Sequence, residues 1–349
     1  MTDTDLDQAV DSSLDVVSLT AYLDRSSPGL LLGPLEAELI AGGRSNLTYR
    51  ISDGTTSWVL RRPPLGHVLA TAHDVGREFR VMSALAGSSV PVPAMIAHCA
   101  DDSVIGAPFY VMAFAEGEIF RSVEQLEQVA ADQGRSLADG LVDTLVDLHE
   151  IDPAEVGLAE LGRPAGYNER QVRRWVKQVD ASRSRELPGL DELVAGLLDR
   201  VPDGRAAIVH GDYRLDNVVT RPDGGVAAVL DWEMSTLGDP LTDVANMAVW
   251  WDGVAGLDSP VAAVPGEYPG FPPSTYLLER YAARQGVSDD QMSWYLAFAA
   301  FKIAAICEGI HYRDVQGMTV GEGFDRMGGL VVPMIERGQG FLDGAGRVA

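Results

Sequence analysis

The sequence predicts an α+β fold with two lobes, a small β-rich N-terminal lobe with one helix and a larger, mainly helical C-terminal lobe. Two patterns carry this prediction. Short apolar strands alternate with turn residues up to residue 115, and long amphipathic segments replace them after Gly117. The 349 residues suffice for two such lobes. We therefore expect one lobe at 1–116, with a polar extension at 1–30, and the other at 117–349.

The elements of the N-terminal lobe are expected in the order β-β-β-α-β-β, after a short helix around Leu14–Leu23. Gly42-Gly43 separates the first two strands, Asp53-Gly54 turns the second into the third, and Pro63-Pro64 ends the third. The apolar residues of the expected helix recur at helical spacing. The strands are predicted at Glu36–Ala41, Leu47–Ser52, Ser57–Arg61, Ala94–Cys99 and Phe109–Ala115, and the helix at Asp74–Leu85.

The C-terminal lobe is expected to consist mainly of amphipathic helices, with a short strand and a hairpin between them. The hairpin is expected at Pro222-Asp223-Gly224-Gly225, because these residue types favour tight turns. Ser136 is expected to cap the second helix. The helices are predicted at Ser122–Gln133, Leu137–His149, Tyr167–Ala181 and Gln291–Gly309, and the strand at Ala207–Val209.

Composition excludes several classes of function. The formal net charge of -24 argues against a nucleic-acid-binding protein, which normally presents a basic face. Cys99 and Cys307 are too few for a disulfide framework, and they fit a reducing compartment. The N-terminus is acidic, unlike a signal peptide. The longest apolar stretch, Tyr295–Cys307, is interrupted by Lys302 and too short to span a bilayer. We expect a cytoplasmic protein without a membrane partner.

The strongest chemical signal is the run from His210 to Asn217, which reads HGDYRLDN and is followed fourteen residues later by Asp231-Trp232-Glu233. Phosphoryl transfer requires an oriented hydroxyl and cations that neutralise phosphate. One carboxylate must accept a hydrogen bond from that hydroxyl, and Mg²⁺ needs further oxygen ligands, for which an Asn amide and an Asp are suitable. We expect the hairpin at Val218–Leu230 to bring Asp231 beside Asn217.

Other polar residues near this run have simpler interpretations. His210 is expected to be a buried hydrogen-bonding residue that shapes the loop, since geometry and not residue type makes an acid or base. Asp216 could merely cap a turn, and we assign it no role. Asp239, in Gly238-Asp239-Pro240, is expected to be a structural turn or cap residue.

The run from His210 to Asn217 with Asp231-Trp232-Glu233 resembles the aminoglycoside phosphotransferase and choline kinase superfamily, whose loop is His-Gly-Asp-x4-Asn. Tyr213–Asn217 is similar to the branch that precedes acyl-CoA dehydrogenase domains in larger proteins. The resemblance covers nearly the whole chain and implies a protein-kinase-like fold. It also implies that residues 1–116 bind the nucleotide and that 117–349 carry catalysis and substrate binding.

Roles follow from this resemblance for individual residues. Asp212 would be the catalytic base, Asn217 and Asp231 would bind Mg²⁺, and Glu78 would pair with the phosphate-binding cation. Kinases usually place a lysine on the third strand, but this chain has Arg61 there, as the similar branch does, and Arg61 is the expected phosphate contact. Further nucleotide contacts are expected from a glycine loop and from the segment joining the lobes, namely Gly43, Ser45, Asn46, Met112, Ala113 and Ala115.

Basic residues recur at helical spacing opposite an apolar stripe in the segment that begins at Tyr167. They are Arg170, Arg173, Arg174 and Lys177. Such a face is either simply solvated or a docking surface for an anionic acceptor, such as the phosphates of a coenzyme A thioester. A polycationic aminoglycoside would require carboxylates instead. We assign Arg170, Arg174 and Glu233 to the acceptor.

The sequence therefore predicts a magnesium-dependent kinase that transfers the γ-phosphoryl group of ATP, or of GTP, to a hydroxyl of a small molecule. The predicted acceptor is a hydroxyacyl-CoA or a related metabolite, and the resemblance implies an acyl-CoA-handling enzyme as a partner. The alternatives are a non-catalytic nucleotide-binding module of the same fold and an aminoglycoside antibiotic kinase. A protein kinase is disfavoured, because no Ala-Pro-Glu element follows Asp231.

Overall fold

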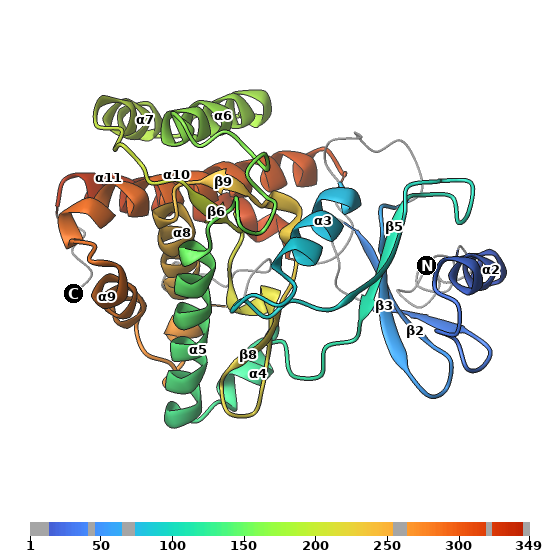
Figure 1. Ribbon diagram of the computed structural model, residues 1–349. Coiled ribbons are helices and arrows are strands. Elements are labelled where there is room, and N and C mark those ends of the chain that lie inside the picture. The colour runs from blue at the N-terminus through green and yellow to red at the C-terminus, as the bar shows by residue number, and fades with distance from the viewer. Residues whose placement is uncertain (1–13, 41–45, 65–73, 254–263, 319–322, 345–349) are drawn as a thin grey trace. The chain divides into compact units, whose positions relative to one another are not determined.

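The computed structural model describes residues 14–40, 46–64, 74–253, 264–318 and 323–344 (Figure 1). The chain divides into two compact units. The first consists of residues 1–116 together with 228–233, and the second of residues 117–227 together with 234–349. The short segment 228–233 carries Asp231 and Glu233 into the first unit.

The first unit is built on a five-stranded antiparallel sheet with the strand order β1-β2-β3-β5-β4. A polar turn joins β2 to β3, and the Asp53 carboxylate accepts the N–H groups of Thr55 and Thr56 there at 2.9 and 2.7 Å. The strands are β1 (Glu36–Leu39), β2 (Leu47–Ser52), β3 (Ser57–Arg62), β4 (Met95–Cys99) and β5 (Phe109–Ala113).

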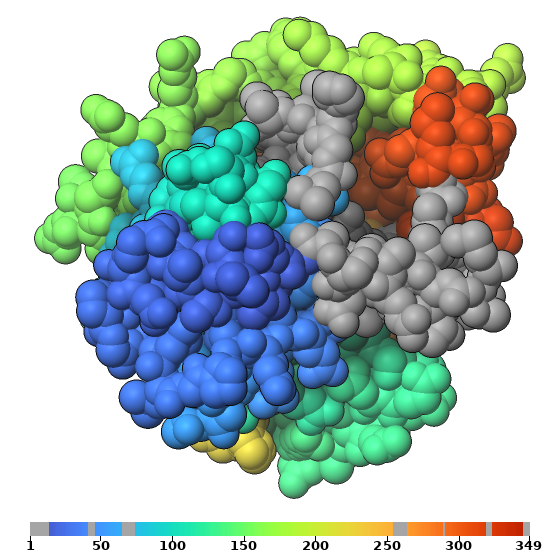
Figure 2. All heavy atoms as spheres, turned by 90° about the vertical axis from the view of Figure 1, so that its right-hand side faces the viewer, coloured from blue at the N-terminus to red at the C-terminus, as the bar shows by residue number. Residues whose placement is uncertain are grey.

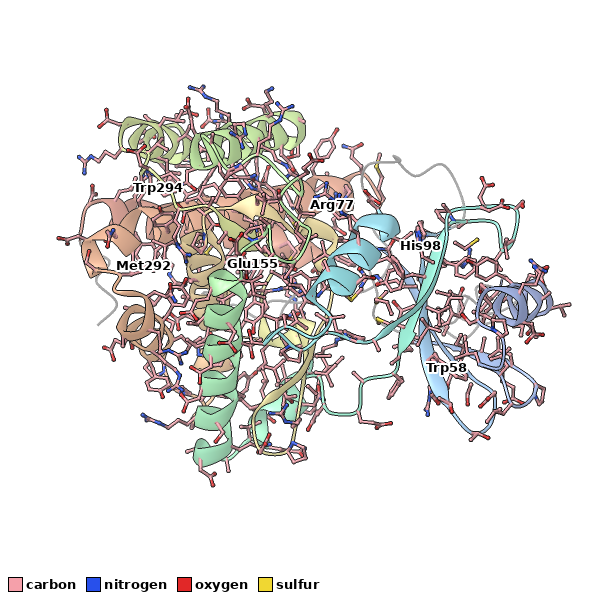
Figure 3. The ribbon with its side chains drawn as sticks, in the orientation of Figure 1. Trp58, Arg77, His98, Glu155, Met292 and Trp294 are labelled. Carbon is pink, nitrogen blue, oxygen red and sulfur yellow. The ribbon has the colours of Figure 1, made fainter. Side chains whose placement is uncertain are left out.

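Two helices pack on the two faces of this sheet, α2 (Val16–Ser26) and α3 (Val75–Leu85). Tyr22 of α2 contacts Phe109 edge-on and donates its hydroxyl to the carbonyl of His98 at 2.7 Å. The ring of His98 stacks on Phe79 of α3 (Figure 3). Because strand residues alternate between faces, Leu60 points toward α2 and its neighbour Arg61 toward α3.

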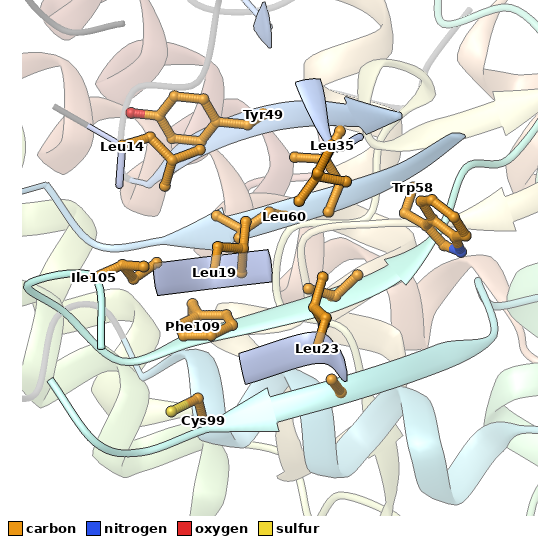
Figure 4. Close-up of a cluster of buried hydrophobic side chains, with 13 residues drawn as sticks. Leu14, Leu19, Leu23, Leu35, Tyr49, Trp58, Leu60, Cys99, Ile105 and Phe109 are labelled. Atoms are coloured by element: carbon orange, nitrogen blue, oxygen red, sulfur yellow. The ribbon is translucent and has the colours of Figure 1, made fainter. Parts of the chain in front are cut away.

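The core of the first unit lies between the sheet and α2 (Figure 4). Leu19 and Leu23 of the helix are fully buried against Ile51, Leu60 and side chains of the neighbouring strands. The outer side of α2 is on the surface, where it belongs to the dark blue region of Figure 2. Burying several large aliphatic side chains stabilises the fold by about 1.5–3 kcal/mol each, which fixes the sheet that carries Arg61.

The second unit is mainly helical and holds two short two-stranded sheets. Its strands are β6 (Ala207–Val209), β7 (Val218–Thr220) and β9 (Thr236–Gly238), and β8 (Val226–Val229) begins in this unit and continues into the segment 228–233 of the first; the pairs are β6-β9 and β7-β8. Its α-helices are α4 (Val123–Glu127), α5 (Ala131–Glu150), α6 (Tyr167–Ser182), α7 (Leu190–Asp199), α8 (Leu241–Asp252), α9 (Ser274–Gln285), α10 (Asp289–Val315) and α11 (Met327–Leu342).

Helix α10 is the central element of the second unit. It packs against α6, α7, α8 and α11, and it carries Trp294 (Figure 3). Trp294 stacks on Phe298 and donates its indole N–H to the carbonyl of Leu197. The apolar stretch Tyr295–Cys307 lies inside this 27-residue helix. By length and composition the segment Asp290–Val315 could cross a membrane, but 89% of its most apolar window is buried inside the fold, as expected of a core helix.

The structure differs from the sequence prediction in the segment 122–150. Two helices were expected there with Ser136 as the cap of the second, but α4 ends at Glu127 and α5 begins at Ala131 without a side-chain cap. Ser136 lies inside α5 and donates its hydroxyl to the Asp132 carbonyl at 3.0 Å. The cap prediction was wrong because serine can bond back to its own helix four residues earlier.

Candidate functional site

Arg61 is the centre of a polar cluster in the first unit. Its guanidinium donates to Asp231 Oδ1 at 2.7 Å and lies 3.5 Å from Glu78 Oε2 and 3.8 Å from Glu233 Oε2. The strand β3 supplies the arginine, α3 supplies Glu78, and the segment after β8 supplies the other two carboxylates. Three carboxylates around one cation leave the cluster with an excess of negative charge.

Glu78 is fully buried at this cluster, although it is a carboxylate. It accepts hydrogen bonds from Asn46 Nδ2 at 3.2 Å and from the Tyr110 hydroxyl at 3.0 Å. Burial raises the pKa of Glu78 to about 8, Arg61 opposes this rise, and Asp231 adds to it. Burial would lower the pKa of Arg61, but Glu78 and Asp231 raise it above its ordinary value. The arginine therefore stays charged, while Glu78 responds to pH.

Asp231 adopts a left-handed backbone conformation with φ of 64°, and it is the one non-glycine residue with positive φ in the described part of the chain. Aspartate tolerates this conformation better than most residues, but it still costs of the order of 1 kcal/mol. Such strain is concentrated at functional sites. The carboxylates of Asp231, Glu78 and Glu233 also approach one another within 4.8 Å, which is close enough to hold a metal ion together.

The raised pKa of Glu78 gives a testable pH dependence of stability. Its folded-state pKa of about 8 exceeds the unfolded value of about 4.3, so the folded protein binds the extra proton and loses stability as pH rises from about 4.5 to 8. Glu78→Gln removes this titrating carboxyl. In EDTA, we expect the free energy of unfolding of the variant minus that of the wild type to increase by a few kcal/mol as the pH rises from 5 to 8.5. Urea unfolding across this range measures it, with the exposed Glu36→Gln as control. A difference that stays constant with pH would contradict the prediction.

The loop from His210 to Asn217 forms a second polar cluster, in the second unit. Asn217 Nδ2 donates to the backbone carbonyl of Asp212 at 2.8 Å and to its Oδ2 at 3.1 Å. His210 is fully buried, and its Nδ1 accepts the N–H of Asp212 at 3.2 Å, which is the shaping role expected for it. Gly211 has φ of 86°, and a Cβ there would lie 2.7 Å from the carbonyl oxygen of Met234. The loop therefore requires glycine at this position.

Asp243 of α8 anchors this loop, and the sequence analysis missed it. Its carboxylate accepts the N–H groups of His210 at 2.6 Å and Gly211 at 2.8 Å, and it lies 3.5 Å from His149 Nε2. The other nitrogen of His149 is 2.8 Å from the Tyr281 hydroxyl. A single acid in the largely apolar segment LTDVANMAVWW was the available signal, because a buried carboxylate must have partners.

Asp212 lies among cations. Burial alone would raise the pKa of its carboxyl, but Arg214 and Lys302 hold that pKa below its ordinary value. Arg214 lies 3.3 Å from Asp212 Oδ2 and also 3.3 Å from Asp216 Oδ2. The carboxylate is therefore ionised at neutral pH, the state that can accept a hydrogen bond from a substrate hydroxyl. Asp212 remains partly exposed, with 28% of its side chain accessible.

The remaining nucleotide contacts predicted from the sequence are distributed as follows. Gly43 and Ser45 lie outside the described residues, whereas Asn46 joins the cluster at Glu78 and also lies 3.5 Å from Glu233 Oε2. The other three lie at the end of β5 and just beyond it; Met112 is buried, and Ala113 and Ala115 are half-buried. The N–H of Ala113 donates to the Ala94 carbonyl at 2.8 Å. Because this N–H is already used, other backbone groups of the segment would have to contact a purine.

The basic residues predicted to bind the acceptor are all exposed on α6. Arg170 donates to the backbone carbonyls of Ala165 and Arg163, and Arg173 forms an exposed ion pair with Glu169 at 2.7 Å. Arg170 thus closes the turn before α6. Arg174 makes a contact with the ring of Trp175 at 5.9 Å. Acceptor binding by Arg170 and Arg174 stays a prediction.

The two clusters contain the groups that phosphoryl transfer to a hydroxyl requires. The loop cluster holds an ionised carboxylate beside an amide, and the cluster at Arg61 holds a cation with several carboxylate oxygens suited to a hard metal ion. A five-stranded sheet region followed by a helical region is the arrangement of the kinase-like phosphotransferases. Fold and sites together define a protein of this class.

Comparison with known proteins identifies the family. Residues 36–276 match the model of the phosphotransferase enzyme family, also called APH. The chain belongs to this family. The resemblance drawn from the run His210–Asn217 is thereby confirmed, as is the kinase-like fold class.

The chain is similar to several named proteins. It is 34% identical to acyl-CoA dehydrogenase family member 11 of Rattus norvegicus over 334 residues, covering 93% of this chain and 43% of the relative. The chain thus spans less than half the length of the curated relatives it matches first. It is also 33% identical to a candidate aminoglycoside phosphotransferase of Ralstonia eutropha, with a TM-score of 0.81 and coverage of 95% of this chain and 99% of that one.

More distant structures share the fold alone. A thermostable mutant of the aminoglycoside phosphotransferase APH(4)-Ia, solved as a ternary complex with AMP-PNP and hygromycin B, is 16% identical. It matches with a TM-score of 0.55 over 95% of this chain and 99% of that one.

Proposed function

We propose that the protein is a magnesium-dependent kinase that transfers the γ-phosphoryl group of ATP to a hydroxyl group of a small molecule. The observation that carries the proposal is the geometry around Asp212, whose carboxylate accepts a hydrogen bond from Asn217 and whose preceding backbone is anchored on Asp243. Family membership supports phosphoryl transfer as the reaction class.

The proposed step uses Asp212 to orient the acceptor hydroxyl. The hydroxyl oxygen attacks the γ-phosphorus and forms the new O–P bond, while the bond from that phosphorus to the β,γ-bridging oxygen breaks. ADP leaves, and the hydroxyl proton passes to the Asp212 carboxylate. Asn217 and Asp231 are the proposed magnesium ligands, since their oxygens suit a hard cation. Magnesium, when bound, would neutralise the phosphate charges.

Arg61 is the proposed cation for the nucleotide phosphates. In the structure this guanidinium is engaged by carboxylates, so phosphate binding requires it to exchange Asp231 for a phosphate oxygen. Magnesium bound by Asp231 would favour this exchange, because the metal takes over the negative charge of the carboxylate. The AMP-PNP complex of the distant fold neighbour supports a nucleotide ligand for this fold. Both ATP and GTP belong in the test, because other neighbours are solved with GDP.

The proposed acceptor is an anionic hydroxylated metabolite such as a hydroxyacyl-CoA. The relatives named as acyl-CoA dehydrogenase family members support an acyl-CoA context, and the exposed basic face of α6 supports an anionic acceptor over a polycationic antibiotic. Because those relatives are more than twice as long as the matched region, we also propose an acyl-CoA-handling enzyme as a functional partner.

Nucleotide binding and turnover test this proposal in one series. Calorimetric titration with Mg-ATP and Mg-GTP should show one binding site, and EDTA should weaken the affinity at least about tenfold. ADP release is then measured with separate pools of hydroxyacyl-CoAs, hydroxy acids, sugars and aminoglycosides. We expect release with the anionic pools. Binding without release from any pool would instead identify a non-catalytic nucleotide-binding module.

A further inference from the structure

Lys302 is a buried cation beside the catalytic loop. The chain contains two lysines, and this one lies on α10 with 8% of its surface exposed. Its Nζ donates a hydrogen bond to the Gly211 carbonyl at 2.7 Å, immediately before Asp212 in the sequence. The ammonium also lies 5.8 Å from the centre of the Trp175 ring on α6. Lys302 therefore connects α10 and α6 with the loop that carries Asp212.

The ammonium of Lys302 is incompletely compensated. Burying a charge is costly unless an opposite charge pairs with it. None of the ion pairs within 4.0 Å in the described residue ranges includes Lys302. Burial accordingly lowers the pKa of Lys302, although Asp212 and Asp243 oppose this. An ammonium has three N–H donors, and the Gly211 carbonyl takes one of them. A carbonyl oxygen and an aromatic ring face compensate the charge of the ammonium less than a carboxylate would.

Two arginines also act on Lys302. Arg174, on the exposed face of α6, is close enough to lower the pKa of Lys302 electrostatically, and Arg214 does the same from the loop. Positive charge therefore extends from α6 to the carboxylate proposed to orient the hydroxyl. Three cations therefore lie around one loop, together with the carboxylates of Asp212, Asp216 and Asp243. Arg214 is paired with Asp212 and Asp216, whereas Lys302 forms no ion pair in the described ranges, so Lys302 is the cation that an added anion would meet.

We propose that Lys302 binds an anionic group, such as a carboxylate, which the acceptor carries near the hydroxyl that Asp212 orients. This inference rests on the proposed function and narrows its acceptor to hydroxy acids with a free acid group, because the acyl part of a hydroxyacyl-CoA carries no charge near its hydroxyl. The charge of Lys302 selects acceptors with an acid group and disfavours neutral and cationic ones. Arg174, on the exposed face of α6, adds to the attraction for the same anionic group.

Two other roles for Lys302 would predict different results. If the lysine only holds the Gly211 carbonyl in place, its removal should weaken transfer to every acceptor equally. If it contacts the transferred phosphoryl group, its removal should also slow ATP hydrolysis with water as the acceptor. Binding of a carboxylate predicts a loss that depends on the charge of the acceptor. The test therefore compares acceptors that differ only in charge.

Direct binding is measured first, without nucleotide. Ligand-observed NMR is carried out with 2-, 3- and 4-hydroxy acids of four to eight carbons, each paired with its primary amide. Wild-type protein should bind at least one acid about tenfold more tightly than its amide. Lys302→Met should abolish this preference, Lys302→Arg should retain part of it, and the exposed Arg200→Met should leave it unchanged. A wild-type protein with no preference for acids overturns the proposal.

Kinetics form the second arm. Lys302→Met should lower kcat/KM for the preferred acid at least about tenfold more than it lowers kcat/KM for its amide or the rate of intrinsic ATP hydrolysis. A smaller loss common to all three is expected, because the variant also removes a donor to the Gly211 carbonyl and a cation that lowers the pKa of Asp212. Equal losses for all three would overturn the proposal. Methionine is close to lysine in size but leaves the Gly211 carbonyl without this donor, so thermal unfolding is measured to show that the variant is folded. If the wild type binds acids through Lys302 but transfers no phosphate to any of them, the proposed function fails and the binding site stands.

Discussion

Asp212→Asn is expected to lower kcat for phosphoryl transfer by about 10²–10⁴-fold. The amide keeps the shape of the side chain but cannot take the hydroxyl proton. Affinity for Mg-ATP should stay within about threefold of the wild type, because the loop is anchored by Asp243 and not by the carboxylate of Asp212. Steady-state ADP release and calorimetric titration measure the two quantities.

Asp216→Asn is the matched control for this variant. Asp212 and Asp216 each lie 3.3 Å from Arg214, so both substitutions remove a carboxylate from the same guanidinium. Asp216 has no assigned catalytic role, and its variant should keep kcat within a few-fold. If Asp212→Asn retained full activity, or if both variants lost activity equally, Asp212 would not be the catalytic base.

Arg61→Met is expected to weaken Mg-ATP binding by about 10–100-fold, the cost of losing charge-assisted hydrogen bonds to phosphate. It should also lower the free energy of unfolding by about 2 kcal/mol, because Asp231 and Glu78 lose their cation. Arg61→Lys keeps the charge but loses the planar set of donors, so it should recover most of the nucleotide affinity. Calorimetry and urea unfolding provide the measurements.

The double variant Arg61→Met with Glu78→Gln separates the two effects. Removing the buried acid together with its partner should restore part of the stability, since an unpaired buried carboxylate is then absent. Nucleotide affinity should remain low, because the phosphate contact is still missing. An Arg61→Met protein that binds Mg-ATP as tightly as the wild type would show that another group holds the phosphates.

Much of the fold could be predicted from local patterns. The alternation of apolar and polar residues in Leu47–Ser52 and the turn at Asp53-Gly54 predicted β2 and the start of β3 correctly. The predicted end of α6 lies one residue before the observed end. The start of α5 could not be predicted, because Ala130 gives no capping signal. Gly134 also weakened the helical pattern there. A Cβ at Gly134 would lie 1.9 Å from the Gly270 carbonyl oxygen, a contact between distant segments that no local pattern shows.

The candidate site was predictable where chemistry imposes a spacing, as in Asp212 and Asn217, and much less so where packing decides. Asp243 lies 33 residues after His210, and its role depends on how α8 packs beside the loop. Lys302 was visible as a charge that interrupts an apolar run, but its contact with the Gly211 carbonyl requires the packing of α10. The left-handed backbone of Asp231 also has no sequence signature, since aspartate adopts many conformations.

Mass spectrometry of phosphoryl transfer tests the central claim most directly. The protein is incubated with Mg-ATP labelled with ¹⁸O in the γ-phosphoryl group and with a metabolite extract, and products are compared with those of Asp212→Asn. We predict a small-molecule product with the added mass of one labelled phosphoryl group (roughly 80 daltons plus the label), formed by the wild type at least about a hundredfold faster than by the variant. Labelled inorganic phosphate as the sole product, or the same phosphorylated metabolite formed at equal rates by both proteins, would contradict the account.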